Sequence, residues 1–182
     1  MKVLIIGSSK SGKSEIAEKI SYKLNKNGNL FYLATMKPYD KEDELRIKNH
    51  KKNREKYNFK TLEIQRDFEI LKDNISENDT ILFESVTSAL TNNMFYNNRV
   101  INDAGKNVIR SLKKNILSFK NVIIVSDYIH SDSIAYDDIT ENYKSQLALV
   151  NTFLSKVCDV VIECSFSNIK IHKGKREYEK II

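Results

Sequence analysis

With 182 residues, of which 41% are hydrophobic and 30% charged, the chain has the size and composition of one soluble globular domain. No apolar run approaches the ~20 residues of a membrane-spanning helix, and a strand is predicted too early to leave room for a signal peptide. The net charge of +6 comes from basic residues interspersed with acidic ones, which does not indicate a nucleic-acid partner. Two cysteines are too few for a disulfide framework or a metal-ligand cluster, so we expect a cytoplasmic protein.

The first predicted strand leads directly into a phosphate-binding loop. Residues 3–6 are apolar without alternation, as expected of a strand buried on both faces of a parallel sheet. Residues 7–14 then read G-x-x-x-x-G-K-S, and residues 14–25 have a helical pattern. In such a loop backbone N–H groups surround the phosphates, Lys13 reaches the β- and γ-phosphates, and the Ser14 hydroxyl binds Mg²⁺. The sequence therefore predicts nucleoside triphosphate binding by Gly7, Ser8, Ser9, Lys10, Ser11, Gly12, Lys13 and Ser14.

Beyond this loop the chain continues to alternate predicted strands and helices. Further strands are expected at residues 30–34, 59–63, 80–83, 122–125 and 159–164. Further helices are expected at about residues 41–57, 86–96, 99–118 and 140–157, with a brief helix around residues 68–75 and a frayed tail from residue 174. This alternation is typical of an α/β fold with a mostly parallel sheet. Together with the phosphate loop, it predicts a single P-loop NTPase-type domain over residues 1–182, with helices on both faces of the sheet.

Polar residues that follow the predicted strands are candidates for the binding site, because ligands gather at the carboxyl ends of strands in such sheets. These residues are Thr35, Glu63, Glu84 and Asp127. Glu84 follows four β-favouring residues, as does the second acidic motif of P-loop proteins, and would hold Mg²⁺ opposite Ser14. The alternative is that Glu84 only stabilises the N-terminus of the next helix. Asp127 is a weaker candidate for the same metal.

The strongly charged helix expected at residues 41–57 carries basic side chains along one side. Arg46, His50 and Arg54 are spaced four residues apart, and Lys51 is adjacent to His50. Near a phosphate loop such a cluster can clamp phosphate groups, whereas elsewhere it is only a solvated basic face. Both interpretations fit the spacing.

Several motifs in a fixed order make the chain similar to a known family. They are Gly7–Ser14, Tyr32-Leu33-Ala34-Thr35, Glu42-Asp43-x-x-Arg46-Ile47-x-x-His50-x-x-x-Arg54, Phe59-x-Thr61-x-Glu63, Leu82-Phe83-Glu84-Ser85-Val86-Thr87 with Leu90-Thr91-Asn92, Val125-Ser126, and Tyr143 to Asn151. With them the chain resembles, over nearly its whole length, the bifunctional adenosylcobinamide kinase/adenosylcobinamide-phosphate guanylyltransferases of cobalamin biosynthesis. The phosphate loop alone is generic, but the Arg-Ile-x-x-His-x-x-x-Arg helix is specific to that family.

The resemblance implies two reactions. The chain would phosphorylate adenosylcobinamide with ATP or GTP, and would then transfer GMP from GTP to the product, giving adenosylcobinamide-GDP. The family carries GMP on a histidine that His50 matches, so the resemblance makes His50 and Lys13 the catalytic residues. The substrate would be a corrinoid. Family members are trimers, which implies that this chain forms a homotrimer. The nucleotide contacts implied outside the phosphate loop are Thr35, Arg46, His50, Lys51, Arg54, Glu63 and Glu84, with Mg²⁺ held by Ser14 and Glu84.

Two segments depart from the family pattern. Residues 127–130, Asp-Tyr-Ile-His, stand where the family has Asn-Glu-Val-Gly, and residues 164–167, Cys-Ser-Phe-Ser, replace an Ala-Gly-x-Pro turn. These segments lie in the half of the chain that would support corrinoid binding and oligomerisation. Two alternatives therefore remain open: a diverged GTP-binding relative without corrinoid turnover, or a P-loop kinase of another small alcohol.

Overall fold

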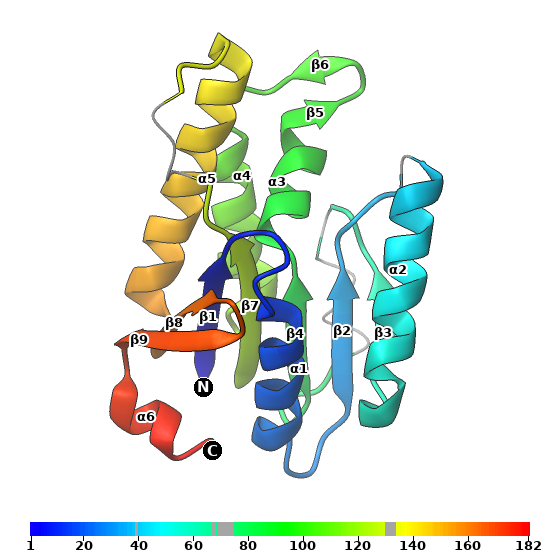
Figure 1. Cartoon of the computed structure of the whole chain (residues 1–182), viewed down its shortest axis with the longest axis vertical. Coiled ribbons are helices and arrows are strands. Elements are labelled where there is room, and N and C mark those ends of the chain that lie inside the picture. Colours follow the sequence, from blue (N-terminus) through cyan, green and yellow to red (C-terminus); the bar gives the residue numbers. More distant parts are fainter. Residues whose placement is uncertain (39, 67, 69–74, 130–133) are drawn as a thin grey trace.

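The computed structural model describes residues 1–38, 40–66, 68, 75–129 and 134–182. Its centre is a seven-stranded sheet in the order β3-β2-β4-β7-β1-β8-β9, in which every neighbouring pair is parallel except β8 and β9 (Figure 1). The strands are β1 (Lys2–Gly7), β2 (Leu30–Ala34), β3 (Lys60–Glu63), β4 (Thr80–Glu84), β7 (Asn121–Asp127), β8 (Val160–Ser165) and β9 (Asn168–Lys173). The predicted α/β fold with a mostly parallel sheet is therefore confirmed.

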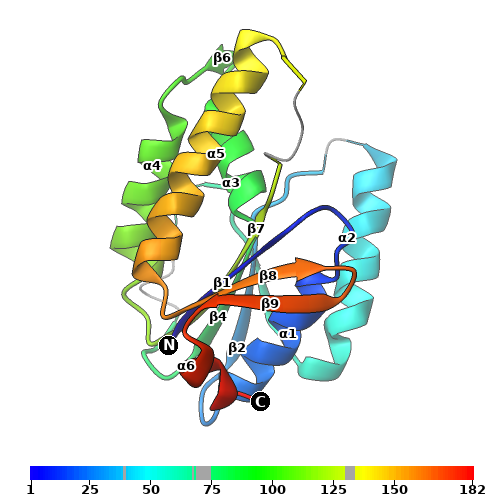
Figure 2. The same ribbon diagram turned by 60° about the vertical axis from the view of Figure 1, so that its left-hand side comes forward.

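Helices cover both faces of this sheet, as predicted. They are α1 (Lys13–Leu24), α2 (Lys41–Arg54) with the short η1 (Glu55–Tyr57), α3 (Val86–Met94), α4 (Ala104–Ser111) with the π-helical η3 (Leu112–Ile116), α5 (Asp138–Val157) and α6 (Lys175–Glu179). Helices α3, α4 and α5 lie on one face, and α1 lies on the other, with α2 beside it (Figure 2). The carboxyl ends of the strands β1, β7 and β4 consequently meet between these two layers.

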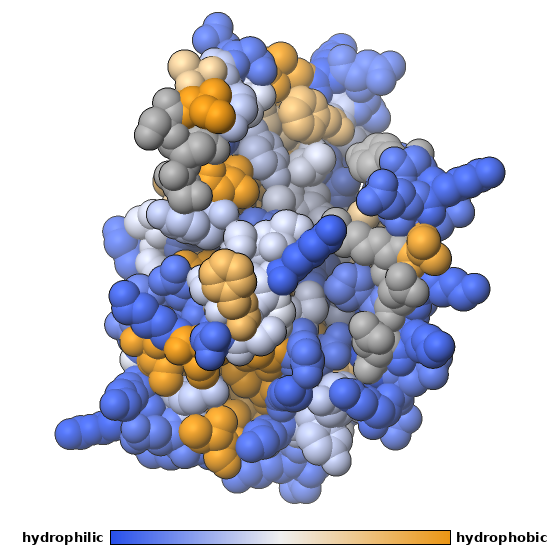
Figure 3. All heavy atoms as spheres, viewed as in Figure 1, coloured by the Kyte–Doolittle hydropathy of each residue, from blue (hydrophilic) through white to orange (hydrophobic). Residues whose placement is uncertain are grey.

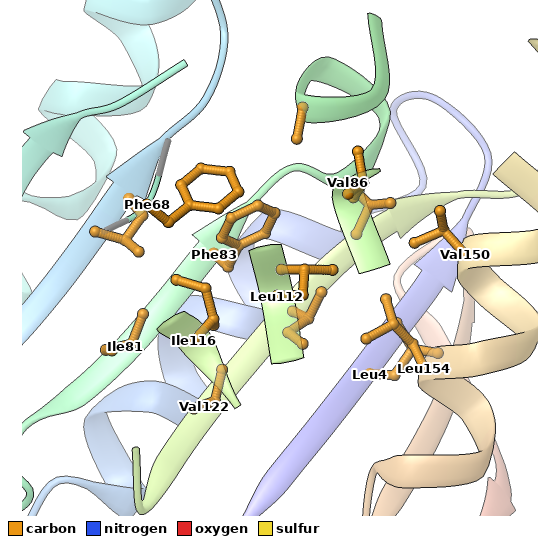
Figure 4. Packing of buried hydrophobic residues seen from close by; sticks show 14 of the residues in the cluster. Leu4, Phe68, Ile81, Phe83, Val86, Leu112, Ile116, Val122, Val150 and Leu154 are labelled. Carbon is orange, nitrogen blue, oxygen red and sulfur yellow. The ribbon is translucent and has the colours of Figure 1, made fainter. Parts of the chain in front are cut away.

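The core explains why the first apolar run does not alternate. Leu4 packs into the cluster under α3, α4 and α5, whereas Val3 and Ile5 pack into the cluster under α1. All three are buried because β1 is central and both of its faces are covered. In the larger cluster Phe68 and Phe83 meet edge to face, with ring centroids 5.2 Å apart (Figure 4).

The helix predicted over residues 99–118 is wrong at its start. The chain first forms a two-stranded hairpin from β5 (Phe95–Tyr96) and β6 (Arg99–Val100), and α4 begins only at Ala104. The turn residues Asn97 and Asn98 both have positive φ angles, of 50° and 56°. Asparagine tolerates this left-handed region and favours tight hairpin turns. The hairpin turn therefore forms in place of the first turn of the predicted helix, although the residues that follow have helical spacing.

The charged tail is ordered rather than frayed. Strand β9 was not among the predicted strands, although Ile169-Lys170-Ile171-His172 alternates apolar and polar residues as an edge strand does. After Gly174 the chain forms α6, and the side chain of Ile181 is buried against the cluster under α1. Tyr178 also packs against this cluster, so two side chains tie the terminal segment to the domain.

The brief helix predicted around residues 68–75 falls mostly outside the described residues, as does part of the loop predicted at 127–139. Among the described helices, none is both long enough and apolar enough to cross a membrane.

Candidate nucleotide-binding site

The phosphate loop joins the centre of the sheet to the N-terminus of α1. Strand β1 ends at Gly7, and α1 begins at Lys13. Gly12 has a φ angle of +93°, a left-handed conformation that a residue with a Cβ rarely adopts. A Cβ on Gly7 would collide with the backbone carbonyl of Cys164 on β8. A Cβ on Gly12 would in turn meet Ser167, so the two glycines allow the loop to pack closely against β8 and the turn that follows it. Backbone N–H groups of a loop that leads into a helix N-terminus are suited to bind phosphate.

The Lys13 ammonium group lies between the loop and the next strand of the sheet. Its Nζ donates to the carbonyl oxygen of Ser8 at 2.6 Å and forms an ion pair with Oδ1 of Asp127 at 2.9 Å. Asp127 ends β7 directly opposite Gly7 in the parallel register. Asp127 was a weaker candidate for binding Mg²⁺, but its contact in this structure is with the lysine.

Ser14 and Glu84 face each other across the same space. The Ser14 hydroxyl donates to Oε1 of Glu84, while Oε2 of Glu84 is buried without a hydrogen-bond partner. A carboxylate oxygen left without a partner beside a hydroxyl is a suitable position for Mg²⁺, which prefers oxygen ligands and completes its shell with phosphates and water. Among the described residues no group of three His, Cys, Asp or Glu side chains forms a separate metal cluster. The residues present therefore fit Mg²⁺ bound together with a nucleotide.

The N-terminus of the next helix is capped by the neighbour of Glu84. Ser85 is the N-cap of α3, and its hydroxyl accepts a hydrogen bond from the backbone N–H of Ser88 at 3.3 Å. Glu84 precedes this cap and points toward Ser14 on α1.

Glu18 is a further carboxylate at this site, which the sequence analysis did not single out. It lies four residues after Ser14 on α1 and lines the same cavity as Glu84, although only 3% of the residue is exposed. Burial raises the pKa of Glu18 to about 7, the negative charge of Glu84 adds to this effect, and the Arg54 guanidinium opposes it. The helical spacing from Ser14 was the available signal, since residues four apart share a helix face.

Replacing Glu18 with glutamine is expected to remove a pH-dependent destabilisation. The pKa of Glu18 is about 7 in the folded chain, against a usual 4.5, so the folded state binds more protons between these values. Glu18 therefore contributes most to the free energy of unfolding below pH 4.5, where it is protonated in both states. This contribution falls, by at most about 3 kcal/mol, as the pH rises through the folded-state pKa of about 7. In denaturant unfolding the variant should gain stability over the wild type across this interval.

Glu15→Gln is the matched control on the same helix. Glu15 is exposed and pairs with Lys19 at 2.8 Å, and the hydrogen bond from Lys19 lowers the pKa of the Glu15 carboxyl. At pH values above the usual pKa of a carboxyl group, this substitution should lower the free energy of unfolding slightly, because it removes the pair with Lys19. A difference between Glu18→Gln and the wild type that stays constant with pH would contradict the assignment of a buried, proton-binding carboxyl.

Helix α2 places His50 between two cavities. The first cavity, of about 820 Å³, is bounded by the phosphate loop, α1, Glu84 and Asp127 on one side and by α2 on the other. The second, of about 460 Å³, lies under α2 against β2 and β3. His50 lines both cavities, and its side chain is partly buried. The structure therefore brings the histidine and the phosphate loop to one shared space.

The basic residues around His50 have different surroundings. Arg54 is 4% exposed, with its guanidinium 3.6 Å from the ring centroid of Tyr32, and it donates to Oγ1 of Thr61 at 3.2 Å. Lys51 pairs with Glu63 at 2.7 Å. The side chain of Arg46 is outside the described part of the chain. Hydrophilic residues dominate the outer surface over α2 (Figure 3), as expected of a helix that covers a site rather than a core.

Thr35 lines neither of the two cavities. Its side chain is fully buried, and its hydroxyl both accepts from the backbone N–H of Ser85 at 2.7 Å and donates to the Ser85 carbonyl at 2.8 Å. The Thr35 carbonyl accepts from Asn92 of α3 at 2.7 Å. Thr35 thus joins β2 to the start of α3, and its backbone N–H also donates to the carbonyl oxygen of Glu84 at 3.0 Å.

The fold and this site define a P-loop nucleotide-binding protein of the α/β class. Solved structures support the fold assignment. The protein PH0250 from Pyrococcus horikoshii OT3 has a TM-score of 0.53 at 12% identity, covering 97% of this chain and 88% of that one. A second solved structure, an ATPase domain, has a TM-score of 0.51 at 14% identity, covering 89% of this chain and 68% of that one.

The chain belongs to the cobinamide kinase/cobinamide phosphate guanyltransferase family, whose model matches residues 3–167. A curated relative, the bifunctional adenosylcobalamin biosynthesis protein CobU of Escherichia coli (strain K12), is 31% identical over 96 residues. The aligned part is 52% of this chain and spans about half, 51%, of the relative. The predicted resemblance to this family is thus confirmed.

Proposed function

We propose that this chain is a bifunctional transferase that phosphorylates adenosylcobinamide with ATP or GTP and then converts the product to adenosylcobinamide-GDP with GTP. The observation that carries the proposal is that His50 and the phosphate loop line one cavity, of about 820 Å³. Family membership gives the substrate class, since the family is described by these two activities. By the same resemblance the enzyme is a homotrimer. The phosphate loop implies Mg²⁺, and the low cysteine content favours the cytoplasm.

In the first reaction the acceptor hydroxyl attacks the γ-phosphorus of the nucleotide, and the bond to the β-phosphate oxygen breaks. The amides of the phosphate loop hold the nucleotide, and Lys13 neutralises the β- and γ-phosphate oxygens. Ser14 and Glu84 would hold Mg²⁺, which supplies further charge neutralisation on the phosphates when it is bound.

In the second reaction a neutral nitrogen of His50 attacks the α-phosphorus of GTP, and pyrophosphate leaves. The phosphate of the corrinoid product then attacks the phosphorus of the histidine-bound GMP and releases the imidazole. Arg46, Lys51 and Arg54 are the cations proposed to offset charge on the triphosphate. Because Arg54 contacts Tyr32 and Thr61 in this structure, its contribution requires these contacts to exchange for phosphate.

The second cavity, of about 460 Å³, suits a guanine base. Tyr32, Met36 and Ile47 supply apolar and aromatic surface. Glu63 offers a carboxylate at the wall, of which Oε1 pairs with Lys51 in this structure. A carboxylate accepts hydrogen bonds from N1–H and the 2-amino group of guanine, which adenine does not offer in the same arrangement. This chemistry supports GTP as the nucleotidyl donor.

Incubating the purified chain with adenosylcobinamide, Mg²⁺ and either GTP or ATP tests the proposal. With GTP we expect two corrinoid products by mass spectrometry, the phosphate and the GDP derivative, whereas with ATP only the phosphate should form. Absence of both products, with GTP still bound, would favour a diverged GTP-binding relative. Consumption of nucleotide only with a different alcohol would favour a kinase of that alcohol.

A further inference from the structure

An exposed aromatic side chain stands beside the phosphate loop, and neither reaction has so far required it. Phe166 is 93% exposed, more than any other large hydrophobic residue in the part of the chain that the structure describes. It occupies the turn between β8 and β9, which lies next to the start of α1 (Figure 1). Exposure alone carries no argument, because single apolar side chains are common on protein surfaces. The backbone of this turn and its contacts do carry one.

The turn presents Phe166 at a conformational cost. Ser165 pairs with Asn168 across the hairpin, and the two residues between them, Phe166 and Ser167, have φ angles of 52° and 60°. Hairpin turns with both central residues at positive φ favour asparagine and glycine, and a bulky residue in this region is an outlier. Such strain collects at ligand sites, where the surrounding structure maintains it.

Three contacts fix this turn against the phosphate loop. The backbone N–H of Ser167 donates to the carbonyl oxygen of Ser11 at 2.8 Å, and the Cys164 thiol donates to the same oxygen at 3.0 Å. The Ser167 hydroxyl oxygen lies 2.7 Å from the position that a Cβ on Gly12 would occupy, and Gly12 directly precedes α1. The main chain that carries the Phe166 ring is therefore positioned by the loop that would hold the phosphates.

The strand order indicates on which side of the loop a nucleoside can lie. Lys13, which reaches the β- and γ-phosphates in such loops, pairs with Asp127 at the end of β7. Ser14 faces Glu84 at the end of β4. Strand β8 lies on the opposite side of β1 from both of these strands. A triphosphate laid across the loop with its γ-phosphate over β7 and β4 has its nucleoside on the side of β8, where Phe166 stands.

The two proposed reactions need the nucleotide in different orientations. GMP transfer brings the α-phosphate to His50 on α2, with the guanine base in the second cavity, against β2 and β3. The kinase step must instead present the γ-phosphate to the acceptor, and it is proposed to accept ATP as well as GTP. Glu63 in the second cavity favours guanine, whereas stacking on a phenyl ring has no such preference, because every base offers an aromatic face.

We propose that Phe166 stacks on the base of the nucleotide that donates its γ-phosphate in the first reaction, an inference that rests on the proposed function. The ligand is a purine nucleoside triphosphate with either base, bound with its phosphates in the loop and its base over the β8–β9 turn. GMP transfer does not use this contact, because the base lies under α2 in that reaction.

Phe166→Trp gives a direct readout of this contact, because the chain contains no other tryptophan. The fluorescence of this single indole should be quenched on titration with ATP and Mg²⁺ and should stay unchanged with inorganic triphosphate and Mg²⁺, which fill the loop without a base. Tyr22→Trp is the matched control, at a residue on α1 that is 55% exposed and lines neither cavity. Its fluorescence should respond to neither compound.

Phe166→Ala separates the two reactions. In phosphate transfer from γ-labelled ATP or GTP to adenosylcobinamide, the KM for the nucleotide should rise about 10-fold while kcat stays within about twofold, the scale of one lost stacking contact. Phe166→Tyr keeps an aromatic ring and should retain the wild-type KM. Labelling of the protein by α-labelled GTP should remain at the wild-type level in both variants, which also shows that they are folded.

Each contrary result has its own meaning. An unchanged KM in Phe166→Ala, equal losses in both reactions, or equal quenching of Phe166→Trp by ATP and by inorganic triphosphate would overturn the stacking contact and leave the proposed function standing. A change of oligomeric state in gel filtration, with an unchanged KM, would overturn it by assigning Phe166 to contacts between copies of the chain. A wild-type chain that does not phosphorylate adenosylcobinamide would overturn the proposed function, while the tryptophan titration would still test by itself whether a bound base meets the turn.

Discussion

His50→Ala is expected to abolish labelling of the protein by α-labelled GTP. The proposed second reaction stores GMP on the imidazole of His50, and alanine offers no nucleophile in its place. We expect the acid-labile phosphoramidate to fall at least about 1,000-fold, while phosphate transfer from ATP stays within about tenfold because that reaction uses the phosphate loop. Label retained on the protein after gel filtration, at neutral and at acid pH, measures the effect.

His172→Ala is the matched control for this experiment. His172 lies on the edge strand β9, where its Nε2 is 2.7 Å from Oε2 of Glu163 and both side chains are well exposed. Removing it deletes an exposed imidazole that lines neither cavity, so labelling should remain at the wild-type level. Undiminished label in His50→Ala would remove His50 from the mechanism.

The phosphate loop and the sheet could be predicted because their signals are local. An unbroken apolar run, a glycine-rich octapeptide and a helical pattern follow one another within residues 3–25, so no distant contact is needed to recognise them. The role of Glu84 as the residue opposite Ser14 was likewise accessible, since parallel strands place their carboxyl ends at one edge. The structure adds that Ser85 caps α3 and that Glu84 contacts Ser14.

Spacing could predict which residues share a helix face but not how deeply each is buried. His50 and Arg54 are one turn apart on α2, yet His50 is only partly buried and lines both cavities, while Arg54 lines the second cavity alone and is buried over the ring of Tyr32. Burial of a guanidinium is tolerated there because the aromatic face and the hydroxyl of Thr61 replace water. Tyr32 and Thr61 belong to strands β2 and β3, and the periodicity of a helix carries no information about its contacts with strands.

The Lys13–Asp127 pair and the state of Glu18 could not be predicted for a related reason. The pair joins residues more than a hundred positions apart, and it exists because β7 is inserted between β1 and β4. The raised pKa of Glu18 depends on burial and on the neighbouring Glu84, which arise only when α1 docks on the sheet. In both cases contacts between elements that are distant in the sequence decide the electrostatics of the site.

Lys13→Met is expected to abolish both reactions. In phosphate loops this ammonium group contacts the β- and γ-phosphates. Both reactions depend on holding these groups, as substrate in one and as leaving pyrophosphate in the other. We expect losses of at least about 1,000-fold in phosphate transfer and in protein labelling. The affinity for GTP, measured by fluorescence titration with a labelled analogue, should fall in parallel.

The same substitution leaves Asp127 without its cation, which should cost about 1–3 kcal/mol of unfolding free energy because the Lys13 side chain is only 9% exposed. Lys19→Met is the matched control: it lies on the same helix and loses only the exposed pair with Glu15 at 2.8 Å, worth about 0–1 kcal/mol. It should keep both activities. If Lys13→Met folds and still carries out either reaction at the wild-type rate, that reaction does not use the phosphate loop, and the shared-cavity mechanism fails for it.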